Sequence, residues 1–278
     1  PGGVASLELG FLRLSEAFLW LDPYLVHYEI DTSTNLEHRD AYNRFVNAHR
    51  VEFRIKKLTF AWSEAVFYSR LNGPPELAYF NPLTLYYAES WNAYALAEDD
   101  YVWVLDACLA LPGLLLYGEF FVDDFQYVPE KKWDPNQTAG AAGVVKSVGD
   151  WRLRAEAAYA TRWTYNSRLV TTKKIYRGFP LGHPAGSDFL EIYFEARRGE
   201  WEGFLTLLWD GAGSIEEKMP YAGEFPPETF LVSPVKRGFW LGGRYARSLG
   251  PARLELEAGW RRWGGSGPFA RGSVIISF

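Results

Sequence analysis

The residues best suited to binding chemistry are aromatic side chains that stand beside amide and carboxylate groups, chiefly between residues 69 and 100. An aromatic ring can stack on the apolar C–H face of a sugar, and neighbouring amides and carboxylates can hydrogen-bond its hydroxyls. The pattern therefore predicts glycan contacts at Tyr79, Asn81, Tyr86, Tyr87, Trp91, Asn92, Tyr176 and His183. A long loop can also fold on itself around its own aromatics, and this alternative stays open.

A second set consists of charges that alternate with apolar residues in short segments. Such alternation is typical of strands with one polar face and one apolar face. Arginine and carboxylate side chains nearly balance, which favours a salt-bridge network along the polar face over a path that selects ions of one sign. The predicted network contains Arg50, Glu52, Arg54, Glu119, Asp123, Arg152, Arg154, Glu156, Glu191, Glu195 and Arg197.

Signals for catalysis or metal binding are weak in this sequence. The four histidines are scattered and show no zinc spacing such as His-Glu-x-x-His. A membrane hydrolase would need a serine or aspartate beside His183 or His27, for example Ser187 beside His183, and no motif indicates such a pair. Pairs of adjacent acidic residues are common on solvent-exposed loops and do not require a bound calcium ion. We therefore predict no catalytic residue, no cofactor and no metal.

The net charge and the cysteine content argue against two further classes of protein, those that bind nucleic acid and those built on a disulfide framework. The net charge of -5 and the lack of a clustered basic stripe argue against nucleic-acid binding. The single cysteine, Cys108, cannot form an internal disulfide framework and is expected to pack as a small side chain.

The elements that must position these residues are strands. The chain ends in Arg271-Gly-Ser-Val-Ile-Ile-Ser-Phe278, an alternating segment that is typical of the last strand of an outer-membrane β-barrel, and Phe278 is the predicted insertion signal. Aromatic residues make up 17% of the chain, more than a soluble core needs, and they would supply girdles at the two membrane interfaces. No apolar run reaches the roughly 18 residues of a transmembrane helix.

Turns and loops alternate along the chain as in such a barrel. Tight turns are predicted at 56–57, 112–113, 149–150, 198–199 and 250–251, and long polar loops lie between the hairpins. Bulges are expected near Asp22-Pro23 and Ser63-Glu64, because proline cannot donate to a ladder and a charged side chain should not face lipid.

The number of predicted strands indicates whether the barrel is complete. Reading from a first strand at Ser6 to Leu14, we count about 13 strands, whereas bacterial barrels usually have an even number. We therefore expect one β-barrel domain over residues 1–278 that lacks its N-terminal strands. No signal peptide is visible, so the start Pro1-Gly-Gly is expected to be processed or truncated.

Several segments resemble the Wzi family of capsule-assembly outer-membrane proteins. Ala48-His-Arg-Val-Glu-Phe-Arg54 and Ser63-Glu-Ala-Val-Phe-Tyr68 are similar to paired strands of the family. Glu76-Leu-Ala-Tyr-Phe-Asn-Pro-Leu83 resembles its long extracellular loop, and Tyr117-Gly-Glu-Phe-Phe-Val-Asp-Asp124 a later strand. The segment Tyr176 to Pro184 resembles a later loop. The resemblance implies a barrel of roughly 18 strands, of which this chain would be the C-terminal part.

The resemblance also implies a function without catalysis. The protein would help attach or assemble capsular polysaccharide at the surface of the bacterial outer membrane in a lectin-like way. Its partners would be outer-membrane lipid and lipopolysaccharide, the polysaccharide, and the barrel-insertion machinery. The alternatives are a porin-like channel for small solutes or sugars, a membrane-embedded hydrolase, and a purely structural part whose missing strands come from another chain.

Overall fold

A large antiparallel sheet forms almost the whole protein. The computed structural model describes residues 2–31, 36–88, 99–125, 135–221, 223–227, 229–249, 252–262 and 266–276. Fourteen strands belong to the sheet, and every pairing in it is antiparallel. The predicted all-β, antiparallel fold class is therefore confirmed. No helix in the described residues is long and apolar enough to cross a membrane.

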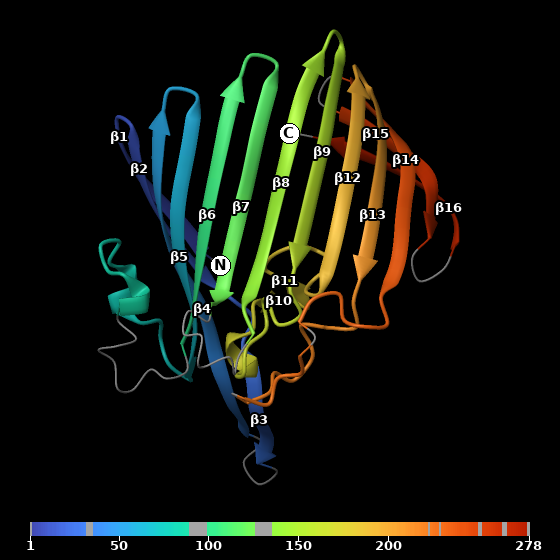
Figure 1. Ribbon diagram of the computed structural model, residues 1–278. Coiled ribbons are helices and arrows are strands. Elements are labelled where there is room, and N and C mark those ends of the chain that lie inside the picture. Colours follow the sequence, from blue (N-terminus) through green and yellow to red (C-terminus); the bar gives the residue numbers. More distant parts are fainter. Residues whose placement is uncertain are drawn as a thin grey trace.

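The strands follow one another across the sheet almost entirely in chain order (Figure 1). They are β1 (Gly2–Leu9), β2 (Leu12–Trp20), β3 (Tyr24–Asp31), β4 (Leu36–Ile55), β5 (Leu58–Leu71), β6 (Asp100–Leu111), β7 (Leu114–Asp124), β8 (Gln137–Val148), β9 (Trp151–Ala160), β12 (Phe189–Arg198), β13 (Trp201–Asp210), β14 (Lys236–Leu249), β15 (Ala252–Arg262) and β16 (Ser266–Ile276). The sheet is strongly curved, and its two ends turn behind the plane of Figure 1. Among the described residues no pairing joins β1 to β16, so a closed barrel is not part of the described fold.

The start of the sheet differs from the prediction. The expected first strand over residues 6–14 is wrong, because Gly10 has a φ of 63° and turns the chain into the β1–β2 hairpin. β2 and β3 then lie end to end along the 20-residue strand β4. Near Asp22-Pro23 the ladder is interrupted between these two strands, and the backbone N–H of Leu21 still donates to the Arg44 carbonyl at 2.9 Å.

Short turns and long connections lie at opposite ends of the strands (Figure 1). Turns over 10–11, 56–57, 112–113, 149–150 and 199–200 join the hairpins at one end, the last displaced by one residue from the prediction. The turn expected at 250–251 lies outside the described residues. We call the end with the long connections the loop end.

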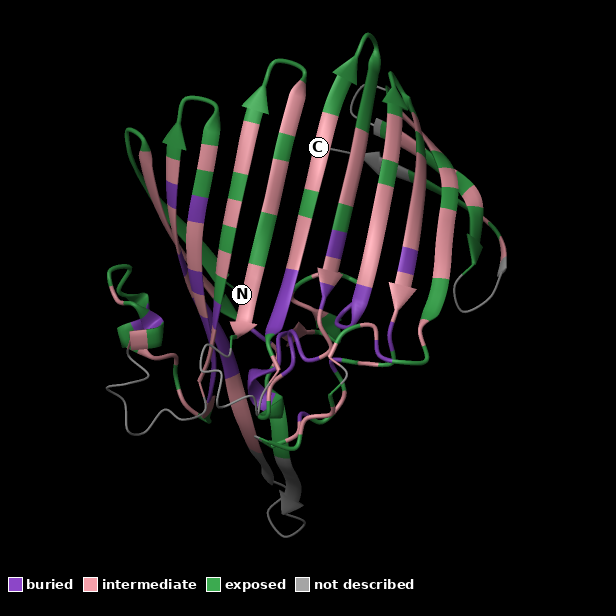
Figure 2. Ribbon diagram, in the orientation of Figure 1, coloured by how far each residue is buried: buried purple, intermediate pink, exposed green. Residues whose placement is uncertain are grey.

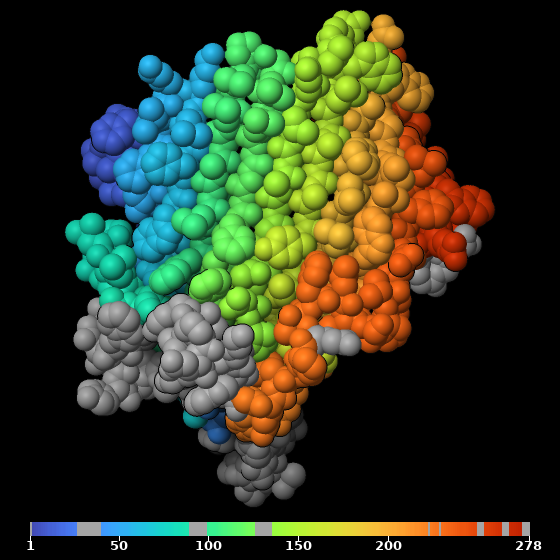
Figure 3. All heavy atoms as spheres, in the orientation of Figure 1, coloured from blue at the N-terminus to red at the C-terminus, as the bar shows by residue number. Residues whose placement is uncertain are grey.

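The two faces of the sheet differ in polarity. The convex face, which Figure 3 shows, carries large apolar side chains that are exposed. Members of this set are Leu105, Leu116, Phe120, Trp151, Leu153, Phe194, Trp201, Leu241, Leu256 and Trp260. The concave face carries the alternating charges, as the cross-strand registers require. Fully buried residues gather toward the loop end (Figure 2).

The predicted bulge at Ser63-Glu64 is wrong. β5 pairs without interruption through Ser63 and Glu64 with both β4 and β6. Glu64 therefore points to the convex face, yet only 1% of it is exposed. The connection between β5 and β6 covers the Glu64 side chain. This folded loop, and not a bulge in β5, shields the charged group from the exterior.

Candidate binding cavity on the concave face

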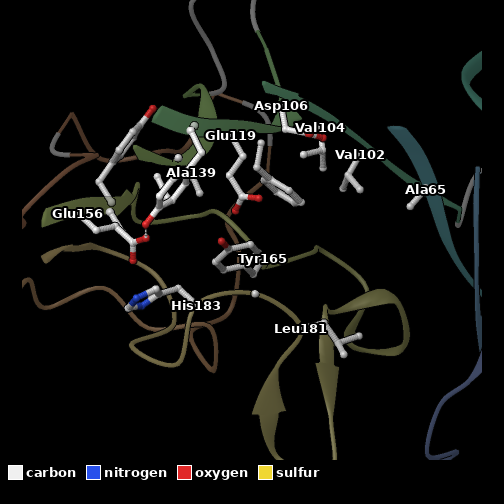
Figure 4. Close-up of a pocket in the computed structure, with 18 of the residues that line it drawn as sticks. Ala65, Val102, Val104, Asp106, Glu119, Ala139, Glu156, Tyr165, Leu181 and His183 are labelled. Carbon is white, nitrogen blue, oxygen red and sulfur yellow. Dashed lines mark hydrogen bonds between the residues drawn. The ribbon is translucent and has the colours of Figure 1, made fainter. Parts of the chain in front are cut away.

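A cavity of about 780 Å³ lies on the concave face, beside the connection between β9 and β12 (Figure 4). Strands β4 to β9 and β12 contribute to its wall, and the connection supplies the remainder. Its volume falls within the range of ordinary small-ligand sites. Aromatic and acidic side chains both line it, among them Tyr117, Glu119, Phe121, Glu156, Tyr165 and His183.

The connection itself, residues 161–188, folds across the concave face, and we call it the inner segment. It contains the short 3-10 helix η2 (Val170–Thr172) and the small hairpin of β10 (Ile175–Tyr176) and β11 (Phe179–Pro180). Tyr165 packs with Phe189 and Ile215 in a buried apolar cluster. Leu181 and Tyr176 pack against a second cluster that includes Val46, so the segment has its own apolar contacts with the sheet.

A buried lysine anchors the inner segment to the sheet. Lys174 is 1% exposed, and its Nζ lies 2.5 Å from an Asp100 oxygen and 2.6 Å from an Asp123 oxygen. Burial alone would lower the pKa of Lys174, but the two carboxylates outweigh burial and raise the pKa. The lysine is therefore charged, and the inner segment is joined to the loop ends of β6 and β7.

A buried arginine of β4 provides a second anchor. Arg44 donates from Nε to the Thr171 carbonyl at 2.6 Å, and from Nη2 to the Lys173 carbonyl and, at 3.1 Å, to the Ile175 carbonyl. The three carbonyls lie between η2 and the start of β10, where the inner segment passes over β4. One guanidinium thus fixes the path of the inner segment over β4.

The connection between β13 and β14 braces the inner segment from the other side. Asp188, which is fully buried, accepts hydrogen bonds from the backbone N–H groups of Gly213 at 2.8 Å and Val232 at 3.2 Å. The Lys173 ammonium donates to the Ile215 carbonyl at 2.9 Å, and Arg162 pairs with Glu217 at 2.6 Å. The inner segment is therefore held on two sides.

The polar groups of the cavity are ordered by one another. The Tyr117 hydroxyl donates to Glu156, and Arg154 donates to that hydroxyl at 3.0 Å and to the Glu156 carboxylate at 2.7 Å. The His183 ring stacks on Phe189 with centroids 4.3 Å apart, and its Nε2 lies 3.6 Å from Glu191. Burial raises the pKa of Tyr165 to about 12, so its hydroxyl stays protonated. Aromatic faces and fixed polar groups thus converge on the same space.

The predicted glycan residues separate into different environments. Tyr79 and Tyr86 are buried, with their hydroxyls donating to Asp99 at 2.5 Å and to Glu16 at 2.9 Å. They form the core of a folded loop, which is the alternative weighed above, and they offer no ring face to a sugar. Asn81 and Tyr87 are exposed. Trp91, Asn92 and the predicted insertion signal Phe278 lie outside the described residues.

Tyr176 and His183 both belong to the inner segment. His183 lines the cavity, whereas the half-buried Tyr176 stands beneath Arg177, whose guanidinium lies 5.2 Å from the ring centroid. Of the six predicted glycan residues that the structure describes, only His183 is therefore placed on the cavity wall.

The predicted charges line the concave face, and some of them form ion pairs there. Arg54 lies 2.7 Å from Glu52, and Arg50 pairs both with Glu52 at 3.1 Å and with Asp106, through a second contact at 2.9 Å. Glu119 lines the cavity, and Glu195 accepts a hydrogen bond from Tyr193 at 3.1 Å. Arg197 donates to the Gly199 carbonyl at 3.3 Å and stands opposite Arg152 across β9 and β12. Asp123 departs from this pattern, because it is held by Lys174 of the inner segment.

Arg44, Asp100, Asp106 and Lys174 were missed from the sequence. Asp106 shares the alternation of Val102 and Val104 and could have been found from that spacing. The sequence contains no such signal for Lys174 or Arg44. Lys174 contacts Asp123, 51 positions away, and Arg44 contacts Thr171, 127 positions away.

Ser187 and His183 are not hydrogen-bonded to each other, and the side chain of His27 lies outside the described residues. The Ser187 hydroxyl is buried without a hydrogen-bond partner, and His183 Nδ1 instead accepts from the Ala185 backbone N–H at 3.2 Å. No group of three or more His, Cys, Asp or Glu side chains within the described ranges could hold a metal ion.

Comparison of the chain with protein-family models, with curated proteins and with solved structures found no significant match. These comparisons therefore assign the chain to no family, and the resemblance to Wzi rests on the sequence segments alone.

Proposed function

We propose that the chain forms the C-terminal part of the β-barrel of a bacterial outer-membrane protein, resembling Wzi, that holds surface polysaccharide without catalysing a reaction on it. Three features support a membrane location. The convex face is apolar and exposed, the concave face is polar, and short turns and long loops lie at opposite ends of the strands. A soluble sheet would have to bury such a convex face against another layer.

The anchored inner segment favours attachment of polysaccharide over transport of a solute. Residues 161–188 lie across the concave face and are fixed by Lys174, Arg44 and Asp188. An open diffusion channel needs an unobstructed lumen, whereas a binding protein gains from rigid loops that order a cavity. The geometry therefore favours binding over transport.

The cavity supplies a chemistry that suits a glycan. The half-buried Phe121 and Tyr117 offer aromatic faces, while the exposed Glu119 offers a hydrogen-bonding carboxylate in the same space. Sugars are bound through this combination of stacking and directional hydrogen bonds. We place the glycan contacts there and not at Tyr79 and Tyr86.

Two measurements on the complete protein test the proposal. In planar bilayers the protein should show no large, steady openings, and it should retain polysaccharide purified from the source organism when the folded protein is immobilised. Tyr117→Ala with Glu119→Gln should lower retention at least severalfold, because both side chains line the cavity and neither is fully buried. Tyr221→Ala is the matched control, because Tyr221 is 68% exposed and does not line the cavity.

Other outcomes would reject parts of the proposal. Steady conductance in the unaltered protein would favour the porin-like channel. Silence with no retention would leave a structural role, and equal retention in the cavity variant and its control would remove the glycan from the cavity.

A further inference from the structure

A polar cluster lies on the convex face, where a membrane-spanning sheet would be expected to carry apolar residues. In the registers of β2, β4, β5 and β6, Glu16 stands opposite His49, His49 opposite Glu64, and Glu64 opposite Trp103. Glu64 is 1% exposed and His49 4% exposed, and they lie 3.3 Å apart. These groups share their face with exposed Leu105 and Phe120.

The start of the β5–β6 connection shields this cluster. We call residues 76–88 the cover segment; it contains the 3-10 helix η1 (Leu77–Phe80). The backbone N–H groups of Tyr86 and Tyr87 donate to the two Glu64 carboxylate oxygens at 2.7 and 2.8 Å. The Tyr86 ring packs on His49 with centroids 4.4 Å apart. Figure 1 shows η1, in teal, lying outside the sheet and not beneath it.

The outer side of the cover segment is apolar. Leu77 and Leu83 are each 83% exposed and Leu85 is 55% exposed. Residues 77–88 contain no charged side chain, and the preceding Glu76 pairs with Arg70 at 2.7 Å. Loops that face water are normally rich in charged and polar groups, so this surface is unusual for a solvent-exposed loop.

This apolar surface continues into that of the strands. The Tyr87 ring packs edge-on against the partly exposed Trp103, with centroids 5.2 Å apart, and Leu105 follows Trp103 on the same face of β6. On the other side Phe80 packs against Phe18 of β2 at 5.0 Å. The leucines of the cover segment and the exposed strand residues therefore form one convex surface.

We infer that the cover segment lies in the headgroup layer of the membrane and presents Leu77, Leu83 and Leu85 to lipid. The inference rests on the proposed membrane location of the sheet. Tyrosine and tryptophan, represented here by Tyr87 and Trp103, are the residues that favour this layer. Exposed Asn81 suits the same depth, where headgroups and water can still hydrogen-bond it. An uncharged apolar surface with a few polar groups is what an interfacial segment needs.

The segment also explains how ionisable groups are tolerated on this face. A carboxylate that faced acyl chains directly would be very costly, and Glu64 avoids this cost through three donors, the third being Trp103 Nε1 at 3.0 Å. The loop thus replaces the strand surface with its own and restores an apolar exterior above the buried cluster.

Site-directed spin labelling in phospholipid vesicles tests the inference. Cys108, the only cysteine, is first changed to alanine, and labels are attached to Leu83→Cys, Leu105→Cys and Phe179→Cys in separate full-length proteins. Collision with oxygen, which concentrates in lipid, is compared with collision with a water-soluble nickel complex. All three positions are exposed, at 83%, 51% and 74%, so the labels should not disturb packing.

We expect the label at 83 to show at least a severalfold loss of nickel collision relative to the label at 179. We also expect less oxygen collision at 83 than at 105, as befits an interfacial depth. If the label at 105 contacts oxygen preferentially while that at 83 contacts nickel as freely as that at 179, the inference is wrong and the membrane location stands. If the label at 105 also contacts nickel freely, the proposed membrane location itself fails. Dipolar broadening between labels at 83 would instead place a second copy of the chain against the segment.

Discussion

Replacement of Lys174 by methionine is the most direct test of how the inner segment is held on the concave face. The Lys174 ammonium lies 2.5 Å from Asp100 and 2.6 Å from Asp123, and it also donates to the Asn166 carbonyl at 3.3 Å. Methionine fills a similar volume but leaves two carboxylates facing each other without a cation. Loss of one partner from a buried ion pair typically costs about 3 to 5 kcal/mol. We expect this cost to fall on the docking of the inner segment, because Asp100 and Asp123 are held on paired strands.

Hydrogen exchange of the backbone amides in residues 161–188 measures that docking. A loss of about 3 kcal/mol in the free energy of local opening corresponds to roughly a hundredfold faster exchange where exchange proceeds through that opening. Amides of β12 and β13 should change far less. The exposed turn residue Lys57, changed to methionine, serves as the control for the loss of a positive charge.

A triple variant separates the ion pair from simple loss of packing. Lys174→Met combined with Asp100→Asn and Asp123→Asn removes all three charges and keeps an acceptor for the Tyr165 backbone N–H, so it avoids the cost of unpaired buried charges. It should therefore recover most of the slow exchange. If Lys174→Met alone leaves exchange of the inner segment within about twofold of the unaltered protein, the ion cluster does not hold the segment and the reasoning is refuted.

Three further outcomes are expected. Asp188→Ala removes the acceptor for Gly213 and Val232, and the two buried donors left unpaired should destabilise the 211–235 connection by about 1 to 3 kcal/mol each, measured by hydrogen exchange against Asp150→Ala at an exposed turn. Gly182→Ala would place a methyl group 2.5 Å from the Tyr165 ring, so it should move that ring and weaken polysaccharide retention, while Gly178→Ala, in open space, should cost only backbone strain and leave retention unchanged. The pKa of Lys174 in the folded protein is raised above its ordinary value of 10.5, so its contribution to stability is complete below that pH and is lost as pH rises through the higher folded value. Cleavage of the inner segment by an alkali-tolerant protease should therefore stay slow up to about pH 10. Rapid cleavage already near pH 8 would contradict this direction.

The parts of the fold that depend on local alternation were predicted well from the sequence. Strand faces such as Trp151, Leu153 and Ala155 against Arg152 and Arg154 follow from a period of two, and turns such as 112–113 follow from proline and glycine. The β1–β2 turn was missed because Gly10 stands among apolar residues with no second turn residue beside it. Local pattern therefore fixed the sheet but not its first hairpin.

The covered clusters could not be predicted by the same reasoning. Glu64 breaks the apolar pattern of its face, and the sequence alone indicates a conflict without showing how it is resolved. Its resolution depends on the Tyr86 and Tyr87 amides, which are 22 and 23 positions away. Likewise the predicted sugar-stacking role of Tyr86 followed from residue type, whereas its burial follows from tertiary contacts with His49 and Glu16.

The two faces of the sheet follow one physical rule for buried carboxylates. On the concave face Asp123 is compensated by Lys174 of the inner segment, and on the convex face Glu64 is compensated by amides of the cover segment. A buried carboxylate without such partners would be too costly to retain its charge. Docking of the two segments therefore compensates the carboxylates that the strand registers place at these positions. It follows that the cavity, whose wall includes the anchored inner segment, is already ordered before a ligand arrives.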